Sequence, residues 1–271
     1  MKYCMAIGAV TSPTTPLLLG GDFTENMKTA QSLGFDAVEI HTPEPGALDI
    51  PAICKACRSL NVSIATIGTG QIYGKYGLHL MDTCESNQKR LVDMVKEYIR
   101  IAAALGSRVT IGSIKGNVPK GGDREEHLGI MGRLLQEIDG YAEENGVIML
   151  LEATNHFENN VLNTGAEVRD MIERNGLKNF RILMDTYHIN LEERSLSTCL
   201  KDAGPWLGHI HFADNTRLYP GSGSFQFDLF CRSIQALSYD GVLSAECYPL
   251  PDGMTAAEKT IEFFHKQFGA R

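Results

Sequence analysis

The sequence is poor in basic residues relative to acidic ones, and it lacks long apolar runs. Its 25 Lys and Arg residues are outnumbered by 33 Asp and Glu residues, which gives a formal net charge of −8 at pH 7. Proteins that bind nucleic acids usually carry a clustered basic surface, so this balance argues against a nucleic-acid partner. No stretch reaches the roughly 20 consecutive apolar residues of a membrane-spanning helix, so we expect no membrane partner either.

A recognisable export signal and a disulfide pattern are also missing. The opening stretch MKYCMAIGAV has one lysine and no long apolar segment, unlike a secretory signal. The seven cysteines are an odd number, and we expect reduced thiols in a cytoplasmic protein. Cys54 and Cys57 form a lone CxxC inside PAICKACRSL. A zinc site would need a second pair, and a redox site would need the motif at a helix start, so we interpret both as inert helix cysteines.

Linkers rich in Pro, Gly or Ser are absent, and so are low-complexity segments. The hydrophobic content of 43% and the aromatic content of 8% are ordinary for a packed globular protein. We therefore predict one domain over residues 1–271.

Short apolar segments rich in β-forming residues recur along the chain, each followed by a polar loop and a helical pattern. The amphipathic stretch CESNQKRLVDMVKEYIRIAAALG, for example, ends at Gly106, a natural helix stop. Eight units in 271 residues average about 34 residues each (271/8), which fits a single (β/α)8 TIM barrel. A doubly wound open sheet is the alternative, because a count of strands does not show closure. The eight segments are YCMAIGAV, AVEIHT, SIATIG, RVTIGS, VIMLLEA, RILMDTYH, LGHIHFA and VLSAECY.

Acidic or imidazole side chains stand at the ends of the last four predicted strands, namely Glu152, Asp185, His211 and Glu246. Chemistry in barrels of this kind lies at the carboxyl ends of the strands. Neighbouring strands lie about 5 Å apart, so the four groups can converge on one ion. Three carboxylates and one imidazole suit Mn²⁺, or else Mg²⁺ or Co²⁺. Without a cation, three buried carboxylates would repel one another and lose their hydration.

Other polar residues near strand exits leave alternatives open. His209 shares a strand face with His211 but lies one layer deeper, so we interpret it as a core group or one that orients its neighbours. Glu39 and His41 also share a face, and they either line a pocket or form a hydrogen-bonded pair inside the barrel. Lys115, after the fourth strand, either meets an acidic substrate group or is a solvated loop lysine.

Five motifs together resemble the xylose-isomerase-like TIM barrels over essentially the whole chain. Within these barrels, the chain is most similar to the ketose 3-epimerases, which include D-tagatose and D-psicose 3-epimerases and ketouronate epimerases. The motifs are GFDAVEIHTPE, LEATNHFENNVLNT, DTYHINLEE, HIHFADNTRLYPGSGSFQF and LSAECYPLPDG.

The resemblance implies a role for particular residues. The four strand-end residues would bind one divalent metal, usually Mn²⁺, and Glu152 and Glu246 would also be the catalytic acid and base. Glu158, His188 and Arg217 would contact a small-molecule sugar. Relatives are commonly dimers or tetramers, so a homodimer or homotetramer is expected. The chain departs from the family at His156, where arginine is common; this change affects either how the far end of the substrate is held or how the loop packs.

The implied reaction is inversion of the carbon next to the ketone of a ketose or ketouronate, by proton abstraction and return through a metal-bound enediolate. Inversion needs one base on each face of the carbon, and Glu152 and Glu246 come from different sides of the barrel. An aldose–ketose isomerase of the hydroxypyruvate type and an inosose-type dehydratase are alternatives on the same site. An apurinic endonuclease and a non-catalytic sugar-binding barrel are alternatives of other classes.

Overall fold

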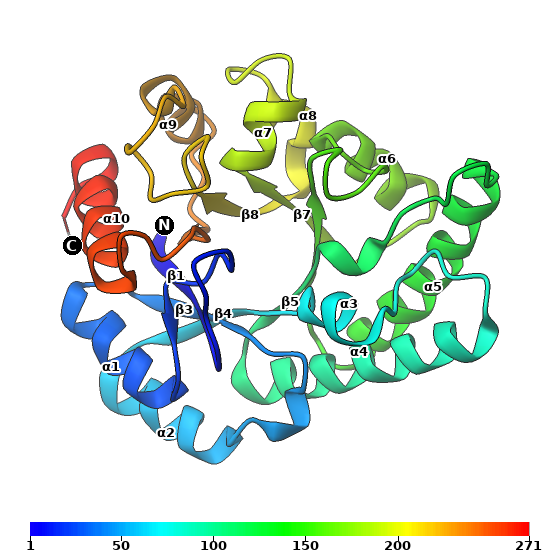
Figure 1. Ribbon diagram of the computed structural model, residues 1–271, viewed down its shortest axis with the longest axis horizontal. Helices are drawn as coiled ribbons and strands as arrows, with labels where there is room; N and C mark the ends of the chain where they lie inside the picture. Colours follow the sequence, from blue (N-terminus) through cyan, green and yellow to red (C-terminus); the bar gives the residue numbers. More distant parts are fainter. Residues whose placement is uncertain (271) are drawn as a thin grey trace.

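The strands pair in parallel around a closed ring, and helices surround the ring on the outside (Figure 1). The computed structural model describes residues 1–270; Arg271, the last residue of the predicted domain 1–271, lies outside the described residues. The strands are β1 (Lys2–Gly8), β2 (Leu19–Gly20), β3 (Ala37–His41), β4 (Ser63–Gly68), β5 (Arg108–Ile111), β6 (Met149–Ala153), β7 (Phe180–Asp185), β8 (Leu207–Phe212) and β9 (Val242–Ala245).

Ten α-helices and three short 3₁₀ helices occur in residues 1–270, most of them between successive strands. The α-helices are α1 (Phe23–Leu33), α2 (Ile50–Leu60), α3 (Gln71–Tyr76), α4 (Glu85–Leu105), α5 (Arg124–Glu144), α6 (Gly165–Arg174), α7 (Thr186–Glu192), α8 (Cys199–Ala203), α9 (Phe227–Ala236) and α10 (Gly253–Phe268). The 3₁₀ helices are η1 (Pro45–Ala47), η2 (Ser113–Lys115) and η3 (Gly204–Trp206).

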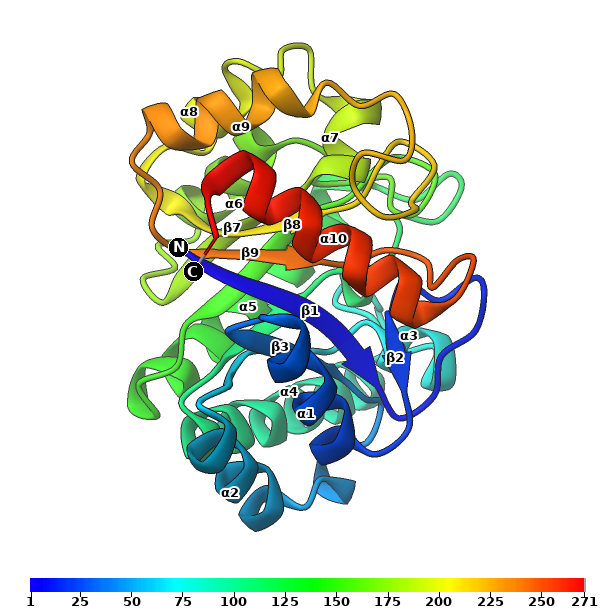
Figure 2. The ribbon, with the colours of Figure 1, turned by 90° about the vertical axis from the view of Figure 1, so that its left-hand side faces the viewer.

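Closure of the sheet decides between the two predicted architectures. The strand order is β2-β1-β3-β4-β5-β6-β7-β8-β9, and β1 also pairs with β9, from Lys2 opposite Val242 to Met5 opposite Ala245. Figure 2 shows this seam, with β1 and β9 side by side and α10 packed over them. The (β/α)8 barrel is confirmed and the open sheet is wrong. The two-residue β2, which pairs with the end of β1, was not predicted.

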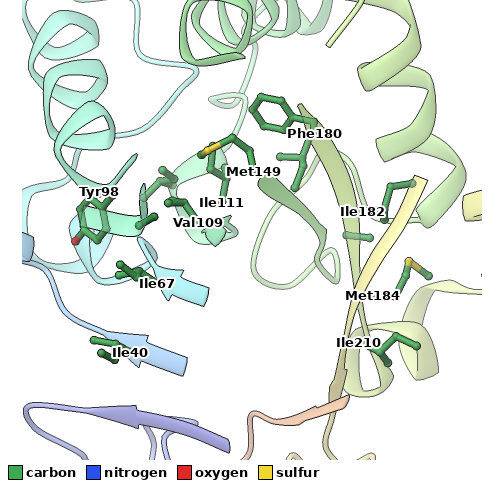
Figure 3. Close-up of a cluster of buried hydrophobic side chains, with 14 of the residues drawn as sticks. Ile40, Ile67, Tyr98, Val109, Ile111, Met149, Phe180, Ile182, Met184 and Ile210 are labelled. Carbon is green, nitrogen blue, oxygen red and sulfur yellow. The ribbon is translucent and has the colours of Figure 1, made fainter. Parts of the chain in front are cut away.

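Alternation along the strands separates an apolar outer face from a polar inner one. The main apolar cluster includes Ile182 and Met184 of β7 and Ile210 of β8, part of which Figure 3 shows beside the surrounding strands and helices. Asp185 and His211 lie between such positions and are therefore on the inner face. Their strands pair so that these two residues are direct neighbours in register. The same pattern that builds the core thus aims the polar residues into the barrel.

Other local predictions have clear outcomes. Helix α4 ends as expected, because Gly106 adopts a left-handed φ of 64° as its cap. Cys54 and Cys57 both lie within α2 as free thiols. Among residues 1–270, no helix combines the length and the apolar character that crossing a membrane requires.

Candidate active site

Four side chains from consecutive strand exits converge inside one end of the barrel, as the sequence predicts. Each offers a ligand atom, and these atoms all lie within 4.8 Å of one another. The Nδ1 atom of His211 is 3.6 Å from Oε2 of Glu246 and 3.9 Å from Oε1 of Glu152. The four residues are Glu152 of β6, Asp185 of β7, His211 of β8 and Glu246, which follows β9.

The donor atoms at this point fit a divalent cation. Glu152 Oε1, Asp185 Oδ2 and His211 Nδ1 are buried and have no hydrogen-bond partner. Two ligands about 2.1 Å from one ion lie about 3.0 Å apart when adjacent and about 4.2 Å apart when opposite, which brackets the separations measured from His211 Nδ1. Buried polar atoms normally have partners, so three unpartnered atoms facing one point indicate a metal site.

Asp185 has two roles, one for each carboxylate oxygen. It is the N-cap of α7, and its Oδ1 accepts a hydrogen bond of 2.8 Å from the backbone N–H of Tyr187. The cap leaves Oδ2 directed at the other ligands, with His188 Nε2 at 4.0 Å. Because the strand ends where the helix begins, His188 falls in the first helical turn and comes back beside the metal ligands.

Glu39 of β3 fixes the orientation of His211. Its Oε2 accepts from His211 Nε2 at 3.1 Å, so Nδ1 is the ring nitrogen left for the metal. Its Oε1 is 2.5 Å from Nε2 of His209, the histidine predicted to lie one layer deeper. Ligand atoms of Glu39, His209 and His211 also lie within 4.8 Å of one another. Their atoms are hydrogen-bonded to each other, so we interpret this group as an internal network.

The charges in the centre shift the pKa values of its members apart. Burial raises the pKa of Glu152 well above its ordinary value, and the negative charge of Glu246 adds to the rise. Burial alone would raise the pKa of Glu246 as well, but the charges of His211 and Arg217 outweigh it and lower that pKa. Burial disfavours the charged form of His211, yet Glu39 and Glu246 outweigh it and raise its pKa. Protons therefore occupy the centre when no cation does.

His188 presents a single N–H to the centre. The side-chain amide of Asn155 donates to His188 Nδ1 at 2.7 Å, while its Oδ1 accepts from the backbone N–H of Phe157. His188 Nε2 then carries the ring proton and lies 3.7 Å from Glu152 Oε1. Burial lowers the pKa of His188 far below its ordinary value, and the positive charge of Arg217 acts in the same direction. A neutral His188 is suited to donate a hydrogen bond to a substrate oxygen.

Arg217 lies between two of the predicted acidic residues. Its Nη1 donates to Glu158 Oε1 at 2.6 Å, and its Nη2 donates to Glu246 Oε2 at 3.0 Å. The guanidinium also stacks over the ring of Tyr187, 4.9 Å from the ring centre. The backbone of Arg217 has a positive φ of 60°, which is unusual for a residue with a Cβ and keeps the loop tightly folded here.

A cavity of about 210 Å³ opens beside the four ligands. The predicted substrate contacts Glu158, His188 and Arg217 line it together with Glu152 and Glu246. Neutral residues complete the lining: Thr15, Thr69, Gln71 and Ser113 supply polar side chains, and Gly68, Gly70 and Gly112 supply backbone. His41 lines the cavity too, whereas Glu39 is fully buried.

Gly112 leaves the space that Glu152 occupies. A Cβ at this position would collide with Oε2 of Glu152, and one at Gly68 would collide with the ring of His41. Both glycines end up at the cavity wall, where strands β4 and β5 leave the barrel. The sequence contains them in glycine-rich loops, but their neighbours are set only by the folded barrel.

The structure shows where Lys115 and His156 lie, and only Lys115 differs from what the sequence suggested. Lys115 is neither solvated nor in the cavity: it is fully buried, and its Nζ donates to the backbone oxygen of Glu152. Both interpretations given for it are therefore wrong. His156 is turned to the outside, where Nδ1 contacts Glu192 at 2.5 Å, and it is not among the residues that line the cavity. Its difference from the family concerns the packing of the loop.

The family to which the chain belongs agrees with this geometry. The family model described as the xylose isomerase-like TIM barrel matches residues 27–267. The chain belongs to this family. The four-ligand group of this chain contains one histidine. This composition does not favour the histidine-rich multi-zinc cluster of an apurinic endonuclease.

The curated relatives of this xylose isomerase-like barrel are sugar epimerases, as the resemblance predicts. A D-psicose 3-epimerase of Enterocloster bolteae is 32% identical over 142 residues, which are 52% of the chain and 46% of that enzyme. A 3-dehydro-D-guloside 4-epimerase of Escherichia coli is 37% identical over 41% of the chain and 43% of the enzyme. The chain thus spans less than half the length of these two relatives. A D-psicose 3-epimerase of Ruminiclostridium cellulolyticum is 30% identical over 83% of the chain and 78% of its own length.

Solved structures share the whole barrel. A crystal structure of a D-psicose 3-epimerase in the presence of D-fructose superimposes with a TM-score of 0.85, covering 99% of this chain and 100% of that one. Sequence identity over this match is 19%, so the likeness shows a common fold.

Proposed function

We propose that the protein is a divalent-metal-dependent epimerase that inverts the carbon next to the ketone of a ketose. The observation that carries this proposal is the group of unpartnered ligand atoms on Glu152, Asp185 and His211, which meets Glu246 beside a small polar cavity. A bound cation would act there as a Lewis acid and make the proton next to the ketone easier to remove.

The two glutamates supply the proton transfers. Glu152 is the penultimate residue of β6 and Glu246 follows β9, so two strands separate them around the ring and they approach a substrate from different sides. One removes the proton, and the other returns a proton to the opposite face, which inverts the carbon. Arg217 lies against Glu246 and favours its ionised form, whereas Glu152 faces the neutral His188. The two carboxyl groups therefore have different surroundings, as an acid and a base require.

The remaining polar groups suit the oxygens of a sugar. His188 offers its Nε2–H, and Glu158 and Arg217 offer an acceptor and donors at the cavity wall. The relatives' names describe inversion at C3 of psicose and at C4 of a 3-dehydro sugar, which in each case is a carbon next to a ketone. Both activities fit one proton-transfer arrangement, and the position of the ketone in the bound sugar decides between them.

The cavity favours a neutral sugar over a phosphorylated or carboxylated one. Arg217 is the one cationic residue in the described lining, and two carboxylates already pair with it. A phosphate or carboxylate on the sugar would find no further cationic residue in the described lining to compensate its lost hydration. We therefore place neutral ketoses ahead of ketouronates and ketose phosphates.

We further propose Mn²⁺ as the metal, because three carboxylates with one imidazole suit its mixed preference for oxygen and nitrogen ligands. The cytoplasmic location, the homodimer or homotetramer and the lack of nucleic-acid and membrane partners stay predictions. Cell fractionation and analytical ultracentrifugation would test the first two.

Proton mapping by NMR tests the reaction itself. The Mn²⁺-loaded protein would be incubated in D₂O with D-psicose, L-ribulose, a ketouronate and a ketose phosphate. We expect deuterium at the carbon next to the ketone, together with the inverted product, from a neutral ketose. Label delivered to an aldose carbon would indicate the isomerase, and loss of water would indicate the dehydratase; either result contradicts the proposal. Absence of both deuterium exchange and product with every sugar would instead support the non-catalytic sugar-binding barrel, and full turnover by a Glu246→Gln variant would show that Glu246 is not a catalytic residue.

A further inference from the structure

Lys115 is a fully buried lysine that the proposed reaction does not use. It lies in η2, just past the exit of β5, and its side chain has no exposure to solvent. The Nζ atom donates to the backbone oxygen of Glu152, to Thr154 Oγ1 at 2.8 Å and to the backbone oxygen of Leu162 at 3.5 Å. Thr154 Oγ1 in turn donates to Asn159, so it is free to accept from the lysine. Three acceptors match the three protons of an ammonium group.

These acceptors bracket the loop that carries much of the site. Glu152 is at the end of β6, and Thr154 and Leu162 are close to one another, since the backbone N–H of Thr154 donates to Leu162 at 3.3 Å. Between these two residues lie Asn155, which orients His188, and Glu158, which pairs with Arg217. The ammonium therefore joins the strand end to both ends of the loop.

Neighbouring residues hold the loop against the same segment. Asn159 Nδ2 donates to the backbone oxygen of Gly116 at 2.7 Å, and Asn117 Nδ2 donates to that of Glu158 at 3.1 Å. Lys115 is the charged member of this contact. Burial lowers its pKa, and the negative charges of Glu152 and Glu158 oppose that effect. A buried cation at this place also offsets part of the repulsion among the carboxylates of the centre.

We propose that Lys115 is a positioning residue that holds the carboxylate of Glu152 and the loop 154–162 in the geometry that binds the metal and the sugar. The inference rests on the metal centre of the proposed function, but its main test needs no substrate. Partners that orient metal ligands usually change metal affinity or activity about 10–100-fold when they are removed.

The first test is a Lys115→Met variant, which keeps the length of the side chain and removes the ammonium. Mn²⁺ binding would be measured by calorimetry with MnCl₂ alone, well below the unfolding temperature of each protein. We expect the Kd for Mn²⁺ to rise about tenfold or more. A Lys120→Met variant, which changes an exposed lysine of the same loop, is the matched control and should bind like the unchanged protein. Lys115→Arg keeps a charge and should recover part of the affinity.

A Thr154→Val variant removes one of the three acceptors of the Lys115 ammonium with little change of shape. It replaces Lys115→Met as the test variant if Lys115→Met does not fold. It should weaken Mn²⁺ binding by a smaller factor. In the double variant, the two effects should not add, because both act through one hydrogen-bonded contact. A purely structural lysine would lower the melting temperature and leave the Kd of the folded protein unchanged.

The outcomes separate this inference from the proposed function. If both variants bind Mn²⁺ like the unchanged protein, the inference is overturned, whatever their melting temperatures. If the unchanged protein binds Mn²⁺ without epimerising any ketose and Lys115→Met still weakens binding, the inference holds and the proposed function fails. If the unchanged protein does not bind Mn²⁺, both are overturned.

Discussion

At the scale of single residues, His211 is prepared for metal binding by a partner far away in the sequence. Glu39 occupies its Nε2 and leaves Nδ1 for the cation. Alternation along β8 predicts the inward direction of His211 from the sequence. The identity of its partner depends on closure of the barrel, which leaves only β1 and β9 between β3 and β8. The strand pattern marks Glu39 as an inner residue and does not tell which histidine it meets.

The first prediction concerns this carboxylate. A Glu39→Gln variant keeps the shape of the side chain and removes the charge that holds both histidines. We expect the Kd for Mn²⁺ to rise about 10–100-fold, as is usual when the partner of a ligating histidine is changed. A Glu44→Gln variant, at an exposed glutamate of the same region, is the control. Equal calorimetric Kd values for the two variants would contradict the role of Glu39.

A second prediction at this scale is a pH dependence. The pKa values of Glu152 and His211 are both raised in the folded, metal-free protein, whereas burial lowers those of His188 and His209. Above the ordinary pKa of histidine, where His188 and His209 are neutral in both states, the folded state therefore binds more protons than the unfolded chain. Its stability therefore falls as pH rises above the ordinary pKa of a histidine, about 6.5. A bound cation takes the place of these protons, so the metal-bound protein does not lose stability in this way as pH rises.

The measurement is thermal unfolding with and without saturating Mn²⁺, from about pH 5 to about pH 8. The increase of Tm caused by Mn²⁺ should grow steadily with pH. A constant or shrinking increase would show that protons and the cation do not compete for the same ligands.

At the scale of elements, the loop after β8 is built around one buried side chain. Asp214 has no exposure, and its carboxylate accepts backbone N–H groups from Asn215, Gly221, Gly223 and Phe225 at 2.8–3.0 Å. The backbone N–H of Arg217 donates to the backbone oxygen of Asp214. This turn therefore fixes the arginine that meets Glu158 and Glu246.

An Asp214→Asn variant should disturb this loop, because the amide group replaces one acceptor oxygen with a donor. We expect a loss of about 1–3 kcal/mol in the free energy of unfolding by urea. We also expect a rise in KM for the ketose, because the position of Arg217 shifts. An Asp240→Asn variant changes an exposed residue and is the control. Unchanged stability and KM in Asp214→Asn would show that the loop is held by other contacts.

At the scale of the whole molecule, the barrel and the convergence of the four strand-end side chains were predictable because both follow from local periodicity. Alternation along β6 to β8 places Glu152, Asp185 and His211 on the inner face, and the closed ring brings them together. Lys115 was not predictable, because its burial depends on a loop that begins almost 40 residues later in the chain. Contacts between loops depend on packing rather than on any repeated pattern, and the same reason explains why the place of His156 was open.

The most direct test of the central claim is anomalous X-ray diffraction from a crystal of the protein soaked with Mn²⁺. The account predicts one strong manganese peak bound by Glu152, Asp185, His211 and Glu246, with Nδ1 as the ligand atom of His211. An absent peak, or a peak bound by other residues, would contradict it.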